Sequence, residues 1–282
     1  MVIDFHAHTF PERIAAQAID KLKHASHTVP FSDGTAAGLV ASMRAAGVDY
    51  SVVLPVATNP LKASSMNDAS LAMTGRNGLI CFGAIHPDTP QAKGELKRIA
   101  KAGLKGVKLH PVYQNVDIDD PRSLRILEAA GELGLVVLMH AGDDIGFPGV
   151  VRCSPQMTAS ALSQVGPVKL ICAHMGGWRN WAHVADCLAG TSAMIDTAFS
   201  LGDLTPLEEG YYAPEQIHML GEADFCSLVR AFSSERVLFG SDSPWSHQGE
   251  SVAAIRALPL TDEEKNNILG ANAAKLLGLR KE

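Results

Sequence analysis

The chain has 282 residues, of which 46% are hydrophobic and 19% charged, and its formal net charge is -6 at pH 7. A chain of this length can bury a large core as one domain, and its acidic balance offers no basic field for a phosphate backbone. These features exclude a typical nucleic-acid-binding protein. We expect a single domain over residues 1–282 that acts on a small-molecule substrate.

The N-terminus and the cysteines bear on cellular location. Residues 1–5 lack the basic stretch of a signal peptide, and no apolar run approaches the roughly 20 residues that cross a bilayer. The five cysteines are spread along the chain without a CxxC pair, as is typical of reduced thiols. The sequence therefore predicts a cytoplasmic protein with no membrane partner, and it leaves a homo-oligomer open.

Short apolar strands alternate with segments of helical period along most of the chain. The expected strands are residues 2–8, 50–56, 79–85, 106–110, 135–140, 169–174, 193–196 and 237–242. The expected helices are residues 11–24, 35–46, 66–76, 89–102, 122–133, 154–165 and 181–188, with terminal helices over 261–270 and 271–277.

Eight strands separated by helices indicate parallel pairing, because crossover helices join neighbouring parallel strands. The number eight favours an α/β fold of the (β/α)8 TIM-barrel type in one domain. A doubly wound open sheet is the alternative. Its nucleotide-binding form is disfavoured, since neither GxGxxG nor GxxxxGK[ST] follows the first strand.

Polar residues end several of these strands, where TIM barrels carry their active sites. His6 and His8 are two residues apart on the first strand, so both imidazoles leave the same face and can bind one metal ion. Later strands end in Lys108 with His110, then His140, His174 and Asp242. Three nitrogen ligands and a carboxylate are typical of a catalytic metal site that keeps a position for water. Taken singly, each histidine is equally well explained as a hydrogen-bonded core or rim residue.

Five motifs carry a resemblance to a known family. They are DFHAHTFP at the N-terminus, HAGDD around His140, AHMGGW around His174, FGSDSPW around Asp242 and the late ILGANAAKLLGL. Together they resemble the amidohydrolase superfamily, and most closely its branch of aminocarboxymuconate-semialdehyde and resorcylate decarboxylases and uncharacterised metal-dependent hydrolases. The resemblance implies a distorted TIM barrel, a divalent metal that is usually zinc, ligands His6, His8, His140 and Asp242, and His174 as the acid–base or second-metal histidine.

These residues suggest two assignments of catalytic roles. In the first, Asp242 accepts a proton from water and passes it to the leaving group, while His174 polarises the substrate carbonyl. In the second, Asp242 is only a ligand and His174 is the base. Further candidates for substrate contact are His110, Arg152 as a carboxylate clamp, and Trp178 and Trp245 as pocket walls. Packing for His110 and the tryptophans, and a solvated surface position for Arg152, are the alternatives.

Lys108 bears on the number of metal ions. A lysine between apolar neighbours at a metal site requires a carboxylate partner, loss of its proton, or carboxylation to a carbamate that bridges two metals. The motif VKLHP resembles the KLYP of dihydroorotases, where such a bridge occurs, and His140 with His174 would then complete a second site. The branch that the whole chain resembles usually holds one metal. We therefore expect one divalent ion, with zinc first and manganese, iron or cobalt as alternatives.

The resulting hypothesis is a metal-dependent hydrolase of a small amide, lactone or ester. A metal-dependent, non-oxidative decarboxylase (carboxy-lyase) of an unsaturated or aromatic carboxylate would use the same ligands and is the second hypothesis. The third is a catalytically silent barrel that serves as a binding protein. Substrate choice is expected to lie in the loops over residues 9–34, 141–154 and 197–225.

Overall fold

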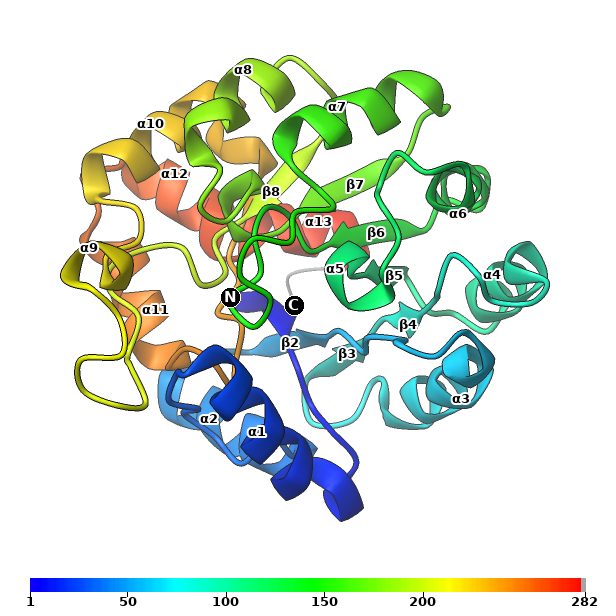
Figure 1. Cartoon of the computed structure of the whole chain (residues 1–282), viewed down its shortest axis with the longest axis horizontal. Helices are drawn as coiled ribbons and strands as arrows, with labels where there is room; N and C mark the ends of the chain where they lie inside the picture. Colours follow the sequence, from blue (N-terminus) through cyan, green and yellow to red (C-terminus); the bar gives the residue numbers. More distant parts are fainter. Residues whose placement is uncertain (280–282) are drawn as a thin grey trace. The chain divides into compact units, whose positions relative to one another are not determined.

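A computed structural model describes residues 1–279, and its elements follow the expected alternation of strands and helices (Figure 1). The strands are β1 (Ile3–Ala7), β2 (Tyr50–Val53), β3 (Leu79–Cys81), β4 (Gly83–Ala84), β5 (Gly106–Leu109), β6 (Val136–Met139), β7 (Lys169–Cys172), β8 (Met194–Asp196) and β9 (Val237–Leu238). The helices are α1 (Glu12–Ser26), α2 (Ala36–Ala46), α3 (Ala63–Met73), α4 (Ala92–Lys101), α5 (Pro111–Gln114), α6 (Pro121–Glu132), α7 (Pro155–Gln164), α8 (Val184–Leu188), α9 (Pro214–Ile217), α10 (Glu222–Phe232), α11 (Gln248–Ala257), α12 (Asp262–Asn266) and α13 (Asn272–Leu277). Within this part of the chain, no helix has both the length and the apolar character needed to cross a membrane.

The chain packs as two compact units, each with its own group of histidines. Unit 1 comprises Met1–Val53, Ile145–Pro148 and Asp196–Glu282, and unit 2 comprises Leu54–Asp144 and Gly149–Ile195. The single domain expected over residues 1–282 stays a prediction.

In unit 1, the buried strand β1 is held on both sides. It pairs in parallel with β2, so that Asp4 lies opposite Ser51. On the other side, the Phe5 amide donates to the carbonyl of Phe239, just after β9 (2.7 Å). Because backbone bonds fix β1 from both sides, the polar residues along it are held in a set register with the chain segment that follows β9.

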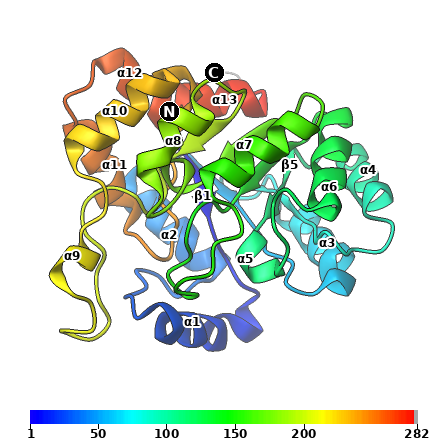
Figure 2. The same cartoon turned by 45° about the horizontal axis from the view of Figure 1, so that its top comes forward.

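In unit 2, strands β4 to β8 form a parallel sheet in chain order. Lys108 of β5 pairs with Leu138 of β6, and Met139 of β6 pairs with Cys172 of β7. The two views of the fold show α4 and α6 side by side along these strands (Figures 1 and 2). Since the strands are parallel and in register, their carboxyl ends bring His110, His140 and His174 to the same edge of this sheet.

Two differences from the expected elements have physical causes. The strand expected over residues 79–85 divides into β3 and β4, with the fully buried Phe82 between them. Helices α5, α9, α10 and α11 lie outside the expected set. α10 begins within the segment 197–225 expected as a loop, and α11 buries only two large apolar side chains, Val252 and Ile255, so that its hydrophobic pattern is weak.

Candidate metal centre

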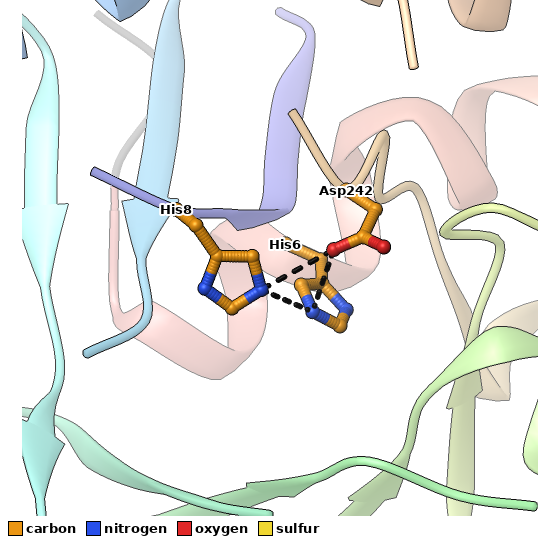
Figure 3. Close-up of side chains that lie close together, drawn as sticks. All are labelled: His6, His8 and Asp242. Atoms are coloured by element: carbon orange, nitrogen blue, oxygen red, sulfur yellow. Dashed lines mark hydrogen bonds and ion pairs between the residues drawn. The ribbon is translucent and has the colours of Figure 1, made fainter. Parts of the chain in front are cut away.

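Three side chains of unit 1 bring their donor atoms together. His6 Nε2 lies 3.1 Å from His8 Nε2, and the Asp242 Oδ1 atom lies 3.4 Å from the first nitrogen and 3.2 Å from the second. Figure 3 shows both imidazole rings and the carboxylate pointing toward one another. Of the predicted ligands, the structure thus brings His6, His8 and Asp242 into one cluster that could hold a metal ion.

The local backbone explains this convergence. The alternation of side chains along β1 puts His6 and His8 on one face. The Asp242 amide donates to the carbonyl of His6 (2.8 Å), and the His8 amide donates to the carbonyl of Ser243 (2.7 Å). Asp242 adopts a left-handed conformation with φ 63°, which is disfavoured for a residue other than glycine. These two hydrogen bonds hold the residue there, so that its carboxylate faces the imidazoles.

Gly240 permits the close approach of this segment to β1. A Cβ atom built at Gly240 would lie only 2.8 Å from the Cβ of His6 and 3.2 Å from that of Ala198. The glycine of the FGSD motif is therefore required by packing against His6, a candidate ligand, and this role is not evident from its place in the motif alone.

A second carboxylate, that of Asp196, orients the His6 ring by bonding the ring nitrogen that does not face the cluster. The Nδ1 atom of His6 lies 2.8 Å from Oδ2 of Asp196, and both side chains are almost completely buried. The other Asp196 oxygen accepts a hydrogen bond from the Ala198 amide (3.0 Å). A carboxylate partner places the imidazole proton on Nδ1 and leaves the lone pair of Nε2 for a metal ion. Asp196 is absent from the predicted site, although its position at the end of an expected strand was a usable signal.

The chemistry of this donor set fits a divalent metal ion. Two imidazole nitrogens and one carboxylate oxygen are ligands that zinc prefers, and manganese, iron and cobalt also accept them. The side chains of His8 and Asp242 are 16% and 11% exposed, whereas that of His6 is 1% exposed. His8 and Asp242 therefore form the side of the cluster that solvent reaches.

Three histidines of unit 2, His110, His140 and His174, form a buried group. His174 Nε2 lies 3.0 Å from His140 Nδ1, and the rings of His110 and His140 stack with their centroids 4.2 Å apart. Asp144, which is absent from the predicted site, places Oδ2 3.4 Å from His110 Nε2. His110, His140 and Asp144 are a second set of donors that could hold a metal ion. The predicted roles of His140 as a ligand of the first metal and of His174 in catalysis stay predictions.

The charge state of His140 leads to a testable pH dependence. Burial holds its pKa well below the ordinary value, neighbouring His110 and His174 lower it further, and Asp144 partly offsets them. Below pH 6.5, the ordinary value of a histidine, the unfolded chain therefore binds a proton that the folded chain does not, and stability falls as pH falls. From pH 7.5 to pH 5.5, we expect His140 to contribute a loss in the free energy of unfolding of at most about 1.4 kcal/mol, the limit for a site that is protonated only in the unfolded chain.

Urea unfolding in the presence of a chelator at these two pH values measures that loss. His140→Asn should flatten the pH dependence by up to this amount. An unaltered pH dependence in His140→Asn would contradict the prediction.

The other polar candidates of unit 2 are Lys108 and Arg152. Lys108 is fully buried on β5. Arg152 donates from Nη1 to Asp117 Oδ1 (2.7 Å) and from Nη2 to the side-chain carbonyl of Asn115, so that its guanidinium is engaged within the unit. Its use as a carboxylate clamp would require these contacts to change.

The two candidate tryptophans lie in different units. Trp178 of unit 2 is buried, with the guanidinium of Arg179 over its ring at 4.8 Å from the centroid. Trp245 of unit 1 is partly buried, and its amide donates to the carbonyl of Asp242 (2.8 Å). Trp245 is thus placed in the turn that carries a candidate ligand, and both predicted roles as pocket walls stay predictions.

Comparisons with known proteins agree with the fold and the motifs. A family model described as "Amidohydrolase" matches residues 3–279. A curated relative, the 2-amino-3-carboxymuconate-6-semialdehyde decarboxylase of Dictyostelium discoideum, is 25% identical over 208 residues, which cover 66% of this chain and 56% of the relative. The matched stretch is thus little more than half of that enzyme.

Two solved structures are similar over nearly the whole chain. An uncharacterised TIM-barrel protein from Bordetella bronchiseptica has a TM-score of 0.76 and 18% identity, covering 99% of this chain and 98% of its own. A protein assigned as a 2-pyrone-4,6-dicarboxylic acid hydrolase from Pseudomonas putida has a TM-score of 0.68 and 20% identity, covering 100% and 98%. These likenesses confirm the predicted fold class, an α/β TIM barrel.

Proposed function

We propose that this chain, which belongs to the amidohydrolase family, is a metal-dependent hydrolase of a small carbonyl compound such as an amide, lactone or ester. The family predicted from the motifs is confirmed by the match over residues 3–279. The chain is accordingly a metal-dependent enzyme, a hydrolase or a decarboxylase, and the choice of hydrolysis, the substrate and the metal are our proposals.

The observation that carries the proposal is the convergence of His6, His8 and Asp242 within 3.4 Å of one another. A divalent ion held by these residues would lower the pKa of a water molecule to about 7 and would polarise a carbonyl group. Asp242, on the exposed side of the cluster, would take a proton from water as the carbonyl is attacked and return it to the leaving group. The bond from His6 to Asp196 keeps the His6 ring fixed while the proton moves.

Two further roles are proposed from the family resemblance. His140 would complete the ligand set, and His174 would polarise the carbonyl oxygen or serve as the base. We also propose one metal ion per chain, with zinc first, and an unmodified Lys108. This part of the proposal would be contradicted by two results together. Elemental analysis would find close to two metal ions per chain, and mass spectrometry would find an added mass equal to carbon dioxide that is lost in Lys108→Ala.

Decarboxylation of an unsaturated or aromatic carboxylate is the second candidate, because the curated relative is a decarboxylase. The two reactions differ in what they release. Hydrolysis of a lactone or ester consumes water and liberates an acid, whereas decarboxylation liberates carbon dioxide and protonates carbon.

The deciding experiment assays protein of known metal content against lactones, esters, amides and unsaturated or aromatic carboxylates, with acid release, amine release and carbon dioxide measured in parallel. We expect acid or amine release from at least one hydrolysable substrate, lost on chelation and absent in His8→Ala. Metal-dependent carbon dioxide release alone would favour the second candidate. A metal-loaded protein that turns over no member of the panel would contradict the proposal and favour the silent binding barrel.

A further inference from the structure

A fully buried carboxylate lies beneath the proposed metal ligands. Asp4 is two residues before His6 on β1, where the register of β1 with β2 shifts between Asp4 and Ala7. Its exposure is 0%. Burying a carboxylate away from water is costly unless hydrogen-bond donors surround it, so the donors around Asp4 indicate what the residue does.

Four hydrogen bonds converge on this carboxylate. Its Oδ1 atom accepts from the amides of His6 (3.1 Å) and Ser241 (2.9 Å). Its Oδ2 atom accepts from the Ser241 hydroxyl (2.5 Å) and from Nε2 of Gln248 (2.7 Å). A single oxygen thus bonds the backbone of one ligand, His6, and the backbone of the residue that precedes another ligand, Asp242.

Further hydrogen bonds hold the two side chains that donate to Asp4, those of Gln248 and Ser241. Gln248, the first residue of α11, also donates from Nε2 to the hydroxyl of Ser51 on β2 (3.2 Å). The Ser241 hydroxyl in turn accepts from the amide of Ser243 (3.0 Å). The left-handed Asp242 therefore lies between two serines that belong to one hydrogen-bonded network centred on Asp4.

We infer that Asp4 is a positioning residue for the metal centre, which sets the spacing between the ligand His6 on β1 and the ligand Asp242 after β9. The inference rests on the proposed metal site at these residues. A metal ion accepts only a narrow range of distances to its ligands, and residues that orient ligands typically contribute 10- to 100-fold to metal affinity. If the hydrogen bonds of Asp4 only stabilised the fold, their removal would lower the stability of the metal-free protein without changing the metal affinity of the folded protein.

The test measures zinc affinity by competition with a chromophoric chelator and, separately, the stability of the metal-free protein. Asp4→Ala leaves the amides of His6 and Ser241 without their acceptor, and we expect the dissociation constant for zinc to rise about 10- to 100-fold after correction for the folded fraction. Asp4→Asn should recover most of the affinity. Its amide oxygen can still accept both backbone bonds, and rotation of the Gln248 amide would turn Oε1, which has no hydrogen-bond partner within residues 1–279, toward the new amide group.

Two further variants make the test decisive. Ser241→Ala removes the hydroxyl bond to Asp4 and the acceptor of the Ser243 amide, but keeps the bond from the Ser241 amide to Asp4. It should weaken zinc binding by less than Asp4→Ala does, and it takes the place of Asp4→Ala in the test if that variant does not fold. Asn272→Ala is the matched control, because Asn272 is also buried in unit 1 and its amide donates to the carbonyls of Ser234 (2.7 Å) and Val237 (2.8 Å). It should lower stability and leave the zinc affinity unchanged.

The outcomes separate this inference from the proposed function. Wild-type zinc affinity in the folded Asp4→Ala and Ser241→Ala proteins would overturn the inference while leaving the metal site intact. A wild-type protein that binds no zinc, manganese, iron or cobalt would instead overturn the proposed function itself.

Discussion

His8→Ala is expected to remove most of the bound metal and of the metal-dependent activity while leaving the protein folded. The imidazole supplies one of three converging donors, and its side chain lies on the exposed side of the cluster. Loss of a direct ligand should cost more than the roughly 100-fold upper range seen for residues that only orient ligands. Elemental analysis after dialysis, together with circular dichroism, measures both effects.

His6→Ala should give the same loss of metal with an additional loss of stability. Removing the buried imidazole takes away the hydrogen bond to Oδ2 of the fully buried Asp196, and the loss of such a buried bond typically costs about 1–3 kcal/mol, or more for a charged group. His24→Ala, an exposed change on α1, is the control that should retain metal and stability. Wild-type metal content in both His6→Ala and His8→Ala would contradict the assignment of this centre.

The candidate ligands that could be brought together from the sequence are those whose placement follows from local geometry. The spacing of His6 and His8 fixes their common face, because side chains alternate along a strand whatever the strand pairs with. Asp242 is identified by its motif and by its position at the end of an expected strand. The structure brings these three together, and they belong to unit 1.

The supporting residues could not be predicted in the same way, because their roles depend on contacts between distant segments. Asp196 is 190 positions from His6, and Asp4 is 237 positions from Ser241. No local pattern indicates that Asp196 faces the imidazole of His6 or that Asp4 accepts from the backbone amides of His6 and Ser241. The stacking of His110 on His140 likewise depends on the register of β5 with β6, which periodicity does not specify.

The helices show the same division between local and distant causes. α2 begins at the Thr35 cap and ends at the left-handed Gly47, as its sequence predicts. At the start of α12, Thr261 forms a capping box with Glu264, as the local sequence explains. α11 has no comparable signal. Its first residue, Gln248, is held from outside the helix by Asp4 and Ser51, so its position depends on the packing of β1 and β2.

Asp242→Asn is expected to lower turnover much more than it lowers metal affinity. The amide keeps an oxygen that can occupy the place of Oδ1, 3.2 Å from His8 Nε2, but it cannot accept a proton at neutral pH. General acid–base catalysis typically contributes 10²- to 10⁴-fold, so kcat at saturating metal should fall by about that factor. Metal affinity should fall less, because a neutral oxygen still binds a divalent ion.

Measuring kcat and the metal dissociation constant on the same preparations tests this separation. Asp203→Asn is a suitable control, since that carboxylate belongs to the same unit, is 57% exposed and pairs with His218. Near wild-type turnover in Asp242→Asn would mean that Asp242 neither carries the proton nor is an essential ligand. Equal losses of turnover and of metal would instead assign Asp242 to metal binding alone, and the proton would then have to be carried by another group, with His174 as the first candidate.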